Sequence, residues 1–321
     1  MTDASISRDA VRAVFDSTQT LPGVQTRSDQ VMGGSGTIIV VGGSPAQLED
    51  MWAFAHQLEA LWSRFISDSD VSRLNWAEGD AVEVDALTVQ LIDAMREGYA
   101  ITAGSYDPTL LPDVLAAGYR ASQVDPARVT TLPATADSPG NLGALRIEGT
   151  TVTMPLGTTL DAGGIGKGLA ADLVVQRALE AGAWGAMAEF GGDIAVDGQA
   201  PDGQGWHLGL ENPFNADEHL EVVSLARGGI VTSSQRKRRF GAGDAATHHL
   251  VDPTTRLSAE TTVQTVTVIA GSAARAEALT KRGFVEDPDH YLQWLPSVGA
   301  AGLIVLADQS TRESSNWGDY R

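Results

Sequence analysis

Residues 160–172, LDAGGIGKGLAAD, place four glycines, one lysine and two aspartates ahead of a helix-like segment. Because glycine has no Cβ, the backbone at Gly163 and Gly164 can approach a ligand closely. A helix beginning near Leu169 has unpaired N–H groups that favour an anion, and the Lys167 ammonium adds positive charge beside them. The stretch therefore predicts a phosphate cradle. A strand-to-helix turn tightened by glycine is the alternative, because the spacing fits neither G-x-G-x-x-G nor a P-loop.

Other segments bring polar groups to expected loops and strand ends. They are residues 67–75 (SDSDVSRLN), 104–112 (GSYDPTLLP), 230–240 (IVTSSQRKRRF) and 248–255 (HHLVDPTT). The short, acidic Asp161 is expected to accept hydrogen bonds from a hydroxyl or a ring N–H rather than to touch phosphate. The cation run at 236–239 is interpreted as a solvated loop in preference to a steering patch.

Hydrophobic periodicity predicts the elements that must position these groups. Amphipathic helices are expected over 48–66 and 86–103, the second with Asp85 as its N-cap, and a short helix over 272–283. Strands are expected over 36–41, 206–213, 263–270 and 302–308, a hairpin over 145–154, and a loop or insertion over 124–149. Helices gather early and strands late, which predicts an α+β fold with mostly antiparallel sheet.

Composition excludes several classes of function. The 321-residue chain has a net charge of -19, which argues against nucleic acid and anionic membrane surfaces as partners. The chain contains no cysteine, so disulfides, thiolate metal sites and cysteine nucleophiles are excluded. No signal-peptide-like apolar run stands near the start and no segment reaches the ~20 apolar residues of a membrane span. The expectation is a cytoplasmic protein without membrane insertion.

Eight segments, in order, resemble the ApbE family of FAD-dependent protein flavinyltransferases. They are VMGGSGTIIV (31–40), SDSDVSRLN, GSYDPTLLP, LDAGGIGKGLAAD, EFGGDIAVDG (189–198), IVTSS (230–234), HHLVDP (248–253) and ARAEALTK (274–281). The resemblance implies an ApbE-like domain of two lobes over 26–310, with FAD between the lobes. Residues 1–25 would then be an N-terminal extension and 311–321 a C-terminal tail.

In that family the FMN moiety of FAD is transferred to a Thr or Ser hydroxyl of an acceptor protein, and AMP leaves. A divalent cation, usually Mg²⁺, takes part. The resemblance implies the same donor, acceptor class and cation here. Some members instead hydrolyse FAD to FMN and AMP.

The resemblance also assigns site residues by position. The implied FAD-binding residues are Met32, Asn75, Ser105, Tyr106, Asp107, Asp161, Lys167, Thr232 and either Leu250 or Val251. His249 corresponds to the family's histidine, so His249 and Lys167 are the predicted catalytic residues; a structural histidine before a turn is the alternative for His249. The backbone carbonyl of Gly164 and the carboxylate of Glu277 correspond to metal ligands.

The helix that carries the metal ligands departs from the family pattern. The family has an acid and a Thr or Asp four residues apart, whereas this chain has Glu277 and Lys281. An ammonium group cannot ligate Mg²⁺. The hypothesis is that Lys281 replaces the cation in part; a slip to Thr280 would turn the ligand away by about 100° on the helix. An FAD-binding protein or FAD pyrophosphatase without protein transfer is therefore the alternative function, and a scaffold that has lost the ligand is a third.

Overall fold

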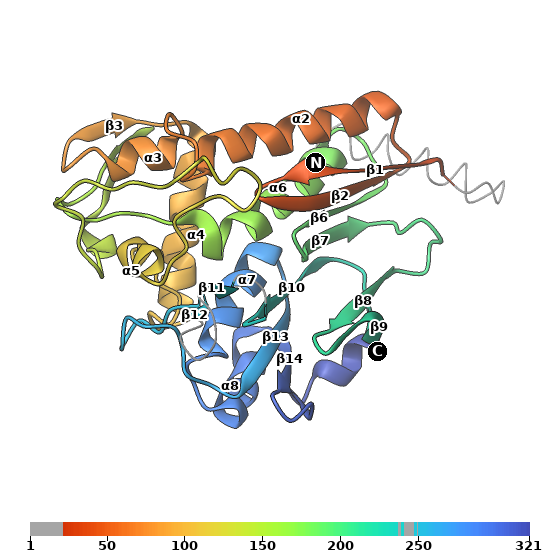
Figure 1. The fold of residues 1–321 in the computed structure, drawn as a ribbon. Coiled ribbons are helices and arrows are strands. Elements are labelled where there is room, and N and C mark those ends of the chain that lie inside the picture. Colours follow the sequence, from red (N-terminus) through yellow and green to blue (C-terminus); the bar gives the residue numbers. More distant parts are fainter. Residues whose placement is uncertain (1–21, 237–238, 241–246, 249) are drawn as a thin grey trace.

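The chain folds around one large sheet. The computed structural model describes residues 22–236, 239–240, 247–248 and 250–321 (Figure 1). The sheet has eight strands in the order β1-β2-β6-β7-β10-β13-β14-β15, and all neighbours are antiparallel. The strands are Val24–Val31 (β1), Gly34–Val41 (β2), Gly185–Phe190 (β6), Asp193–Gly198 (β7), Gly228–Ser234 (β10), Val263–Ala270 (β13), Ala301–Leu306 (β14) and Thr311–Glu313 (β15). The prediction of an α+β fold with mostly antiparallel sheet is confirmed.

Helices cover one face of this sheet and bury the larger apolar core against it. The longer ones are Pro45–Trp62 (α2), Ala86–Ile101 (α4), Gly166–Glu180 (α6) and Ala273–Arg282 (α7). Trp52, Val174 and Leu279 from three of these helices are at most 1% exposed and pack with the strand residues Ile38 and Val268. Alternate residues of each strand point to opposite faces, so one side of β2, β6, β7, β10, β13 and β14 joins this core.

Side-chain caps explain where these helices begin. Ser44 and Gln47 form a reciprocal capping box at the start of α2. Asp85 caps α4 through its side chain, as predicted. α7 begins after Ser272, and its first two amides donate to the Asp172 carboxylate at 2.8 Å each. Because Asp172 lies on α6, this cap also ties the two helices together.

The opposite face of the sheet is covered by a hairpin and by the C-terminal residues. The hairpin joins β8 (Trp206–Asn212) to β9 (Asn215–Leu225), and the last turn is the 3-10 helix η5 (Trp317–Tyr320). Figure 1 shows the C-terminus beside this hairpin. Trp317 is fully buried there, and its indole N–H donates to Glu221 at 2.5 Å. The predicted C-terminal tail, residues 311–321, is thus packed against the hairpin. The domain boundaries stay predictions.

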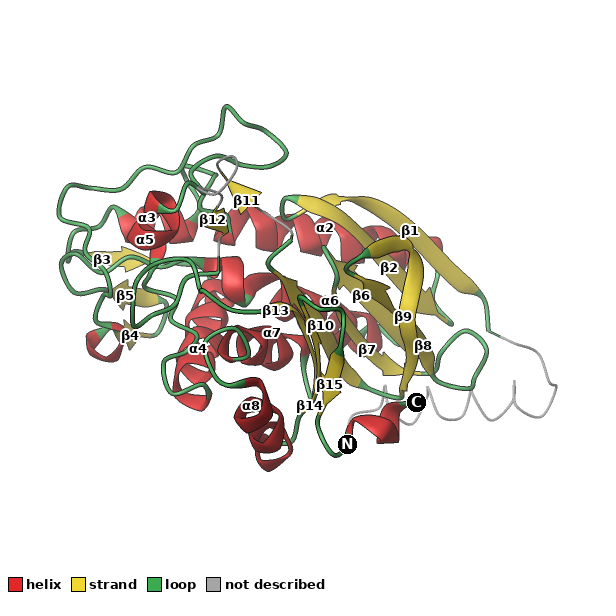
Figure 2. Ribbon diagram, turned by 60° about the horizontal axis from the view of Figure 1, so that its bottom comes forward, coloured by secondary structure: helices red, strands yellow, loops and turns green. Residues whose placement is uncertain are grey.

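A loop-rich lobe extends from the helical side of the molecule, visible at one end of Figure 2. Its small sheet has the order β3-β5-β4, formed by Ala81–Glu83, Thr151–Thr153 and Arg146–Glu148. Its shorter helices are Asp70–Asn75 (α3), Leu111–Ala116 (α5) and Leu142–Ala144 (η1), whereas Ala162–Gly164 (η2) contacts α6 and α7. Elsewhere lie Pro288–Trp294 (α8), Leu295–Val298 (η4) and the short pair Arg239–Phe240 (β11) and Thr247–His248 (β12).

Most of the predicted elements are present, with shifted ends. The helices expected over 48–66, 86–103 and 272–283 are α2, α4 and α7, and the expected hairpin is β4–β5. α2 ends at Trp62 because Ser63 takes an extended conformation. α6 begins at Gly166, earlier than predicted, which places Lys167 in its first turn. Within the described part of the chain, no helix is both long and apolar enough to span a bilayer.

Candidate active site

Two adjoining cavities meet at the glycine stretch. The first, of about 90 Å³, is lined by segments around Tyr106, Leu250 and Lys281. The second, of about 360 Å³, is lined by the β1–β2 turn, the end of α2 and a loop after residue 119. Tyr119, Asp161 and Gly163 line both cavities. The start of the glycine stretch therefore lies where the two cavities share a wall.

Hydrogen bonds fix the backbone of this shared wall. The Asp161 amide donates to the Pro108 carbonyl at 2.9 Å, and one Asp161 carboxylate oxygen accepts from the Gly163 amide at 2.9 Å. A Cβ at Gly164 would stand 2.8 Å from Tyr106 Cε2, so the chain needs glycine here. A Cβ at Gly168 would stand 2.5 Å from a backbone oxygen of α7. Gly168 therefore lets α6 pack closely against α7, while Gly164 leaves the wall of the first cavity without a side chain.

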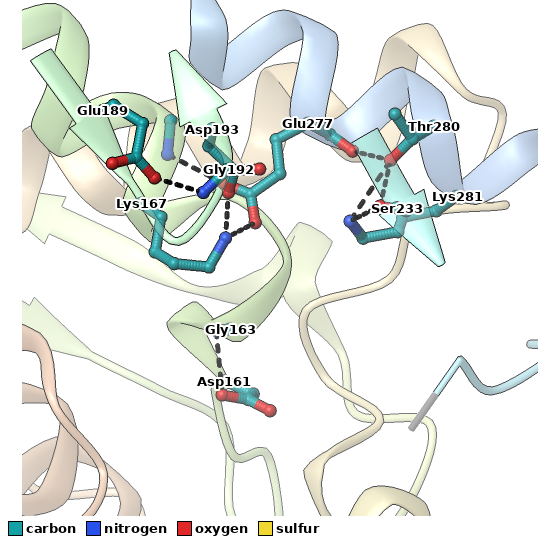
Figure 3. Close-up of polar contacts among 11 residues, drawn as sticks. Asp161, Gly163, Lys167, Glu189, Gly192, Asp193, Ser233, Glu277, Thr280 and Lys281 are labelled. Atoms are coloured by element: carbon teal, nitrogen blue, oxygen red, sulfur yellow. Dashed lines mark hydrogen bonds and ion pairs between the residues drawn. The ribbon is translucent and has the colours of Figure 1, made fainter. Parts of the chain in front are cut away.

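Lys167 is held between two buried carboxylates (Figure 3). Its ammonium pairs with Asp193, at the start of β7, and lies 3.4 Å from Glu277 Oε1 on α7. Asp193 and Glu277 are 2% and 1% exposed. Glu277 Oε2 also accepts the Gly168 amide at 2.9 Å. The positive charge predicted to meet a phosphate is therefore already compensated by acids from β7 and α7.

Lys281 lies on the other side of the glycine stretch. Its ammonium donates to Ser233 Oγ at 3.0 Å and to Thr280 Oγ1 at 3.2 Å (Figure 3). Its Cε would be 3.5 Å from a Cβ built on Gly164, so the side chain reaches the predicted position. The Thr280 hydroxyl is fully buried and donates to the Glu277 carbonyl at 2.6 Å. The same hydroxyl shares a 2.7 Å hydrogen bond with Ser233 Oγ on β10, so Thr280 is already fully engaged, which argues against the one-residue slip.

The side chains at this place do not fit a divalent metal site. Mg²⁺ prefers several oxygen ligands in near-octahedral order. Among the described residues, no group of three or more His, Cys, Asp or Glu could hold a metal ion. Both Glu277 oxygens already accept hydrogen bonds or an ion pair, and the position four residues later carries a cation. The roles of Gly164 and Glu277 as metal ligands stay predictions.

Several predicted FAD-binding residues line the cavities. Ser105, Tyr106, Asp107 and Leu250 line the first cavity, and Met32 and Lys167 the second. Asn75 is buried and instead exchanges two hydrogen bonds with the Leu160 backbone, at 2.7 and 2.9 Å. Thr232 shares a 2.9 Å hydrogen bond with Thr267 and lines neither of these cavities. His249 lies outside the described residues, so its predicted role stays a prediction.

The Tyr106 hydroxyl is buried without a hydrogen-bond partner among the described residues. Burial raises the pKa of this hydroxyl well above its ordinary value, and nearby carboxylates, Glu277 foremost, raise it further. Burial also raises the pKa of the Asp107 carboxyl, against two hydrogen bonds from Thr109 that lower it. An unpaired buried hydroxyl costs about 1–3 kcal/mol. A ligand in the first cavity that accepts from Tyr106 would remove that cost.

Sequence reasoning missed two groups at this site. Asp193 stands in the EFGGD motif but received no role, although an acid directly after two glycines was a usable signal. Arg64 is buried next to Asp161 in the wall of the second cavity, with its Nε 3.4 Å from an Asp161 oxygen. An isolated arginine near the end of an amphipathic helix gives no signal in the sequence, because such residues are mostly solvated.

Curated relatives resemble the chain along most of its length. The FAD:protein FMN transferase of Treponema pallidum is 29% identical over 290 residues, covering 84% of this chain and 80% of the relative. The FAD:protein FMN transferase of Haemophilus influenzae is 24% identical, covering 80% of this chain and 78% of the relative.

Solved structures agree with these relatives. The ApbE protein of Thermotoga maritima superposes with a TM-score of 0.80 at 25% identity, covering 93% of this chain and 99% of that one. The flavinyl transferase ApbE of Pseudomonas stutzeri shares the fold, with a TM-score of 0.77 at 24% identity over 94% of this chain and 97% of that one. The sequence model of the ApbE family matches residues 32–304, and the chain therefore belongs to the ApbE family.

Proposed function

We propose that this chain transfers the FMN moiety of FAD to a Thr or Ser hydroxyl of an acceptor protein and releases AMP. The observation that carries this is the position of the Asp161–Gly164 segment in the wall shared by two cavities. FAD is two nucleotides joined by a diphosphate. One cavity for each ring system, with bare backbone at the junction, suits such a ligand.

The reaction is a phosphoryl transfer. The acceptor hydroxyl oxygen forms a bond to the FMN phosphorus, the bond from that phosphorus to the bridging oxygen breaks, and AMP leaves with the bridging oxygen. The hydroxyl proton goes to a base, for which His249 is the proposed group. Such transfers depend on positioning and on neutralising charge more than on covalent chemistry by the protein.

The charged side chains at the junction set how the diphosphate is received. Lys167 and Lys281 contribute two positive charges, and Asp193 and Glu277 contribute two negative ones. A diphosphate that enters must therefore compete with Asp193 and Glu277 for the Lys167 ammonium. We propose that Lys281, across Gly164, takes over part of the neutralisation, so that the reaction depends less on Mg²⁺ than is usual in the family.

The alternative function is hydrolysis of FAD, and the observation that favours it is Lys281 at the second metal-ligand position.

The protein is incubated with FAD, with and without a purified acceptor that carries a Thr flavinylation site. The proposal expects the acceptor to gain the mass of one FMN for each AMP released, and little AMP without acceptor. Free FMN and AMP in equal amounts without acceptor would support hydrolysis instead. FAD that binds without any AMP release would contradict both.

A further inference from the structure

The second cavity is walled by a loop whose base is held by one buried arginine. Arg64 follows the end of α2, and its side chain is 4% exposed. Its Nη1 donates to Thr130 Oγ1 at 2.6 Å, and its Nη2 donates to the Tyr119 carbonyl at 2.9 Å. The Thr130 hydroxyl also donates back to the Arg64 carbonyl at 3.2 Å. Arg64 therefore forms hydrogen bonds to both ends of the loop from 119 to 130.

The loop that Arg64 holds is a closed turn. Ala121 and Val129 pair as an isolated antiparallel bridge, and residues between them line the second cavity. Those residues are Ser122, Gln123, Val124, Asp125 and Arg128. Because the loop contributes this much of the wall, its placement sets the shape of the cavity.

The remaining guanidinium nitrogen of Arg64 points to Asp161. The Nε lies 3.4 Å from Asp161 Oδ1, the oxygen that also accepts the Gly163 amide. The Arg64 guanidinium carbon lies 4.2 Å from the centre of the Phe65 ring and 4.6 Å from that of Tyr119. Contacts with two rings and three protein oxygens fix the plane of the guanidinium.

A purely stabilising role does not account for this arrangement. A buried charge is costly to desolvate, and well-packed apolar residues of similar volume often stabilise a fold as much or more. The single carboxylate paired with Arg64 belongs to Asp161, one of the three residues that line both cavities. Arg64 belongs to the wall of the second cavity, but direct contact with a ligand is disfavoured, because its side chain is 4% exposed and all three of its nitrogens face protein oxygens.

We propose that Arg64 is a positioning residue: it orients the Asp161 carboxylate at the junction of the two cavities and couples it to the loop that walls the second cavity. This inference rests on the proposed function, since the ligand that Asp161 serves there is FAD. Arg64 itself does not touch FAD. Its effect on FAD binding passes through Asp161.

The test uses the full-length protein and the variant Arg64→Lys, which keeps the charge but loses the planar fork. FAD affinity is measured by the quenching of flavin fluorescence for the wild type, Arg64→Lys, Asp161→Asn and the double variant. Arg64→Lys is expected to weaken FAD binding about tenfold, and the double variant to bind no more weakly than Asp161→Asn. Additive losses would overturn the inference, because they would mean that Arg64 acts on the ligand independently of Asp161.

A matched control and a milder variant separate positioning from loss of folding. Arg177→Lys disturbs another arginine that pairs with an aspartate, Asp50 at 2.9 and 3.0 Å, and stacks on a ring, that of Phe54 at 4.6 Å. The Arg177 side chain is more exposed than that of Arg64 and lies outside both cavity walls. Arg177→Lys should therefore leave FAD binding unchanged. Thr130→Val removes only one partner of Arg64 and should weaken FAD binding about threefold. No loss in either Arg64→Lys or Thr130→Val would overturn the inference.

Hydrogen exchange provides a reading that needs no FAD. The Gly163 amide is protected by Asp161, so Arg64→Lys should speed its exchange about tenfold while Arg177→Lys leaves it unchanged. Unchanged exchange in Arg64→Lys would overturn the positioning role. If the wild type fails to bind FAD, the proposed function fails, and the exchange rates alone then decide whether Arg64 orients Asp161.

Discussion

Ile230 and Val231 are neighbours on β10, yet they pack into different interiors. Ile230 faces the β8–β9 hairpin and Trp317, where the buried cluster is apolar. Val231 faces the helices, where Lys167, Asp193 and Glu277 are brought together next to the apolar core. Burying a charge costs desolvation free energy, whereas burying apolar side chains stabilises the folded state. Both faces therefore stabilise the fold through apolar packing, but the helical side also buries the charges of the site, which costs stability.

Substitutions on the two faces of the sheet should therefore have different effects. Changes on the hairpin side should lower the free energy of unfolding without altering FAD affinity. Changes at the site on the helical side, as distinct from its apolar core, should alter FAD affinity, or the response to pH and metal, at a smaller loss of stability.

Trp317→Ala should lower the free energy of unfolding by about 3–5 kcal/mol, because a fully buried indole leaves a cavity. It also leaves Glu221 without its 2.5 Å partner. Denaturant unfolding measures the loss, and an FAD titration below the transition serves as the control. Unchanged stability, or a loss of FAD affinity in the folded protein, would break the distinction between the faces.

Asp172 predicts a pH dependence of stability on the helical side. Burial raises the pKa of its carboxyl from 3.8 to about 6, against the hydrogen bonds that it accepts from the start of α7. A raised acid pKa means that the folded state binds the proton more tightly than the unfolded state. Ionising Asp172 therefore lowers the free energy of unfolding. This loss is absent below pH 4 and complete above about pH 6.

Asp172→Asn removes this titration and keeps the shape of the side chain. Measured as the difference from the wild type, its stability should improve by up to about 3 kcal/mol as the pH rises from 4 to 7. Unfolding curves at several pH values in that window measure the difference. A difference that stays flat, or that falls with rising pH, would show that the Asp172 proton is not bound more tightly in the folded state.

Gly164→Val should weaken FAD binding about a hundredfold, because its Cβ would stand 2.8 Å from Tyr106 and push into the junction of the cavities. Gly271→Val is a matched control, since a Cβ there meets nothing within 4 Å. Fluorescence titration compares the two variants with the wild type. Equal FAD affinity in all three would show that the glycine stretch is only a packed turn.

Lys281→Thr should lower the rate of AMP release without Mg²⁺ about tenfold and make the rate more responsive to added Mg²⁺. The variant replaces an ammonium with a hydroxyl oxygen, which a divalent cation accepts. Rates are measured after treatment with EDTA and then over a Mg²⁺ titration. Complete and restorable Mg²⁺ dependence in the wild type would contradict the role proposed for Lys281.

Local patterns predicted much of the fold. The β-branched run at 263–270 is β13, which is buried on both faces of the sheet. The capped segment after Asp85 is α4, because burial on one face of a helix gives the sequence a helical period. The packed C-terminus was not predicted, since a lone Trp317 in a polar segment does not reveal which surface it will cover.

The site was predicted where it is continuous in sequence and missed where distant segments meet. The bare backbone around Gly164 and the reach of Lys281 to it followed from motifs. The pairing of Lys167 with Asp193 and Glu277 did not, because it joins α6, β7 and α7 across more than a hundred residues of chain. Arg64 stayed hidden for the same reason: its partners lie 55 and 66 residues away.

In the proposed function, FAD lies across the junction of the two cavities, with its diphosphate at the glycine backbone. A crystal structure of the protein grown with FAD tests this most directly. The diphosphate should lie against Gly163 and Gly164, the flavin and the adenine in separate cavities, and Lys281 should turn toward the phosphates. Both ring systems in one cavity, or a diphosphate bound away from residues 161–168, would contradict it.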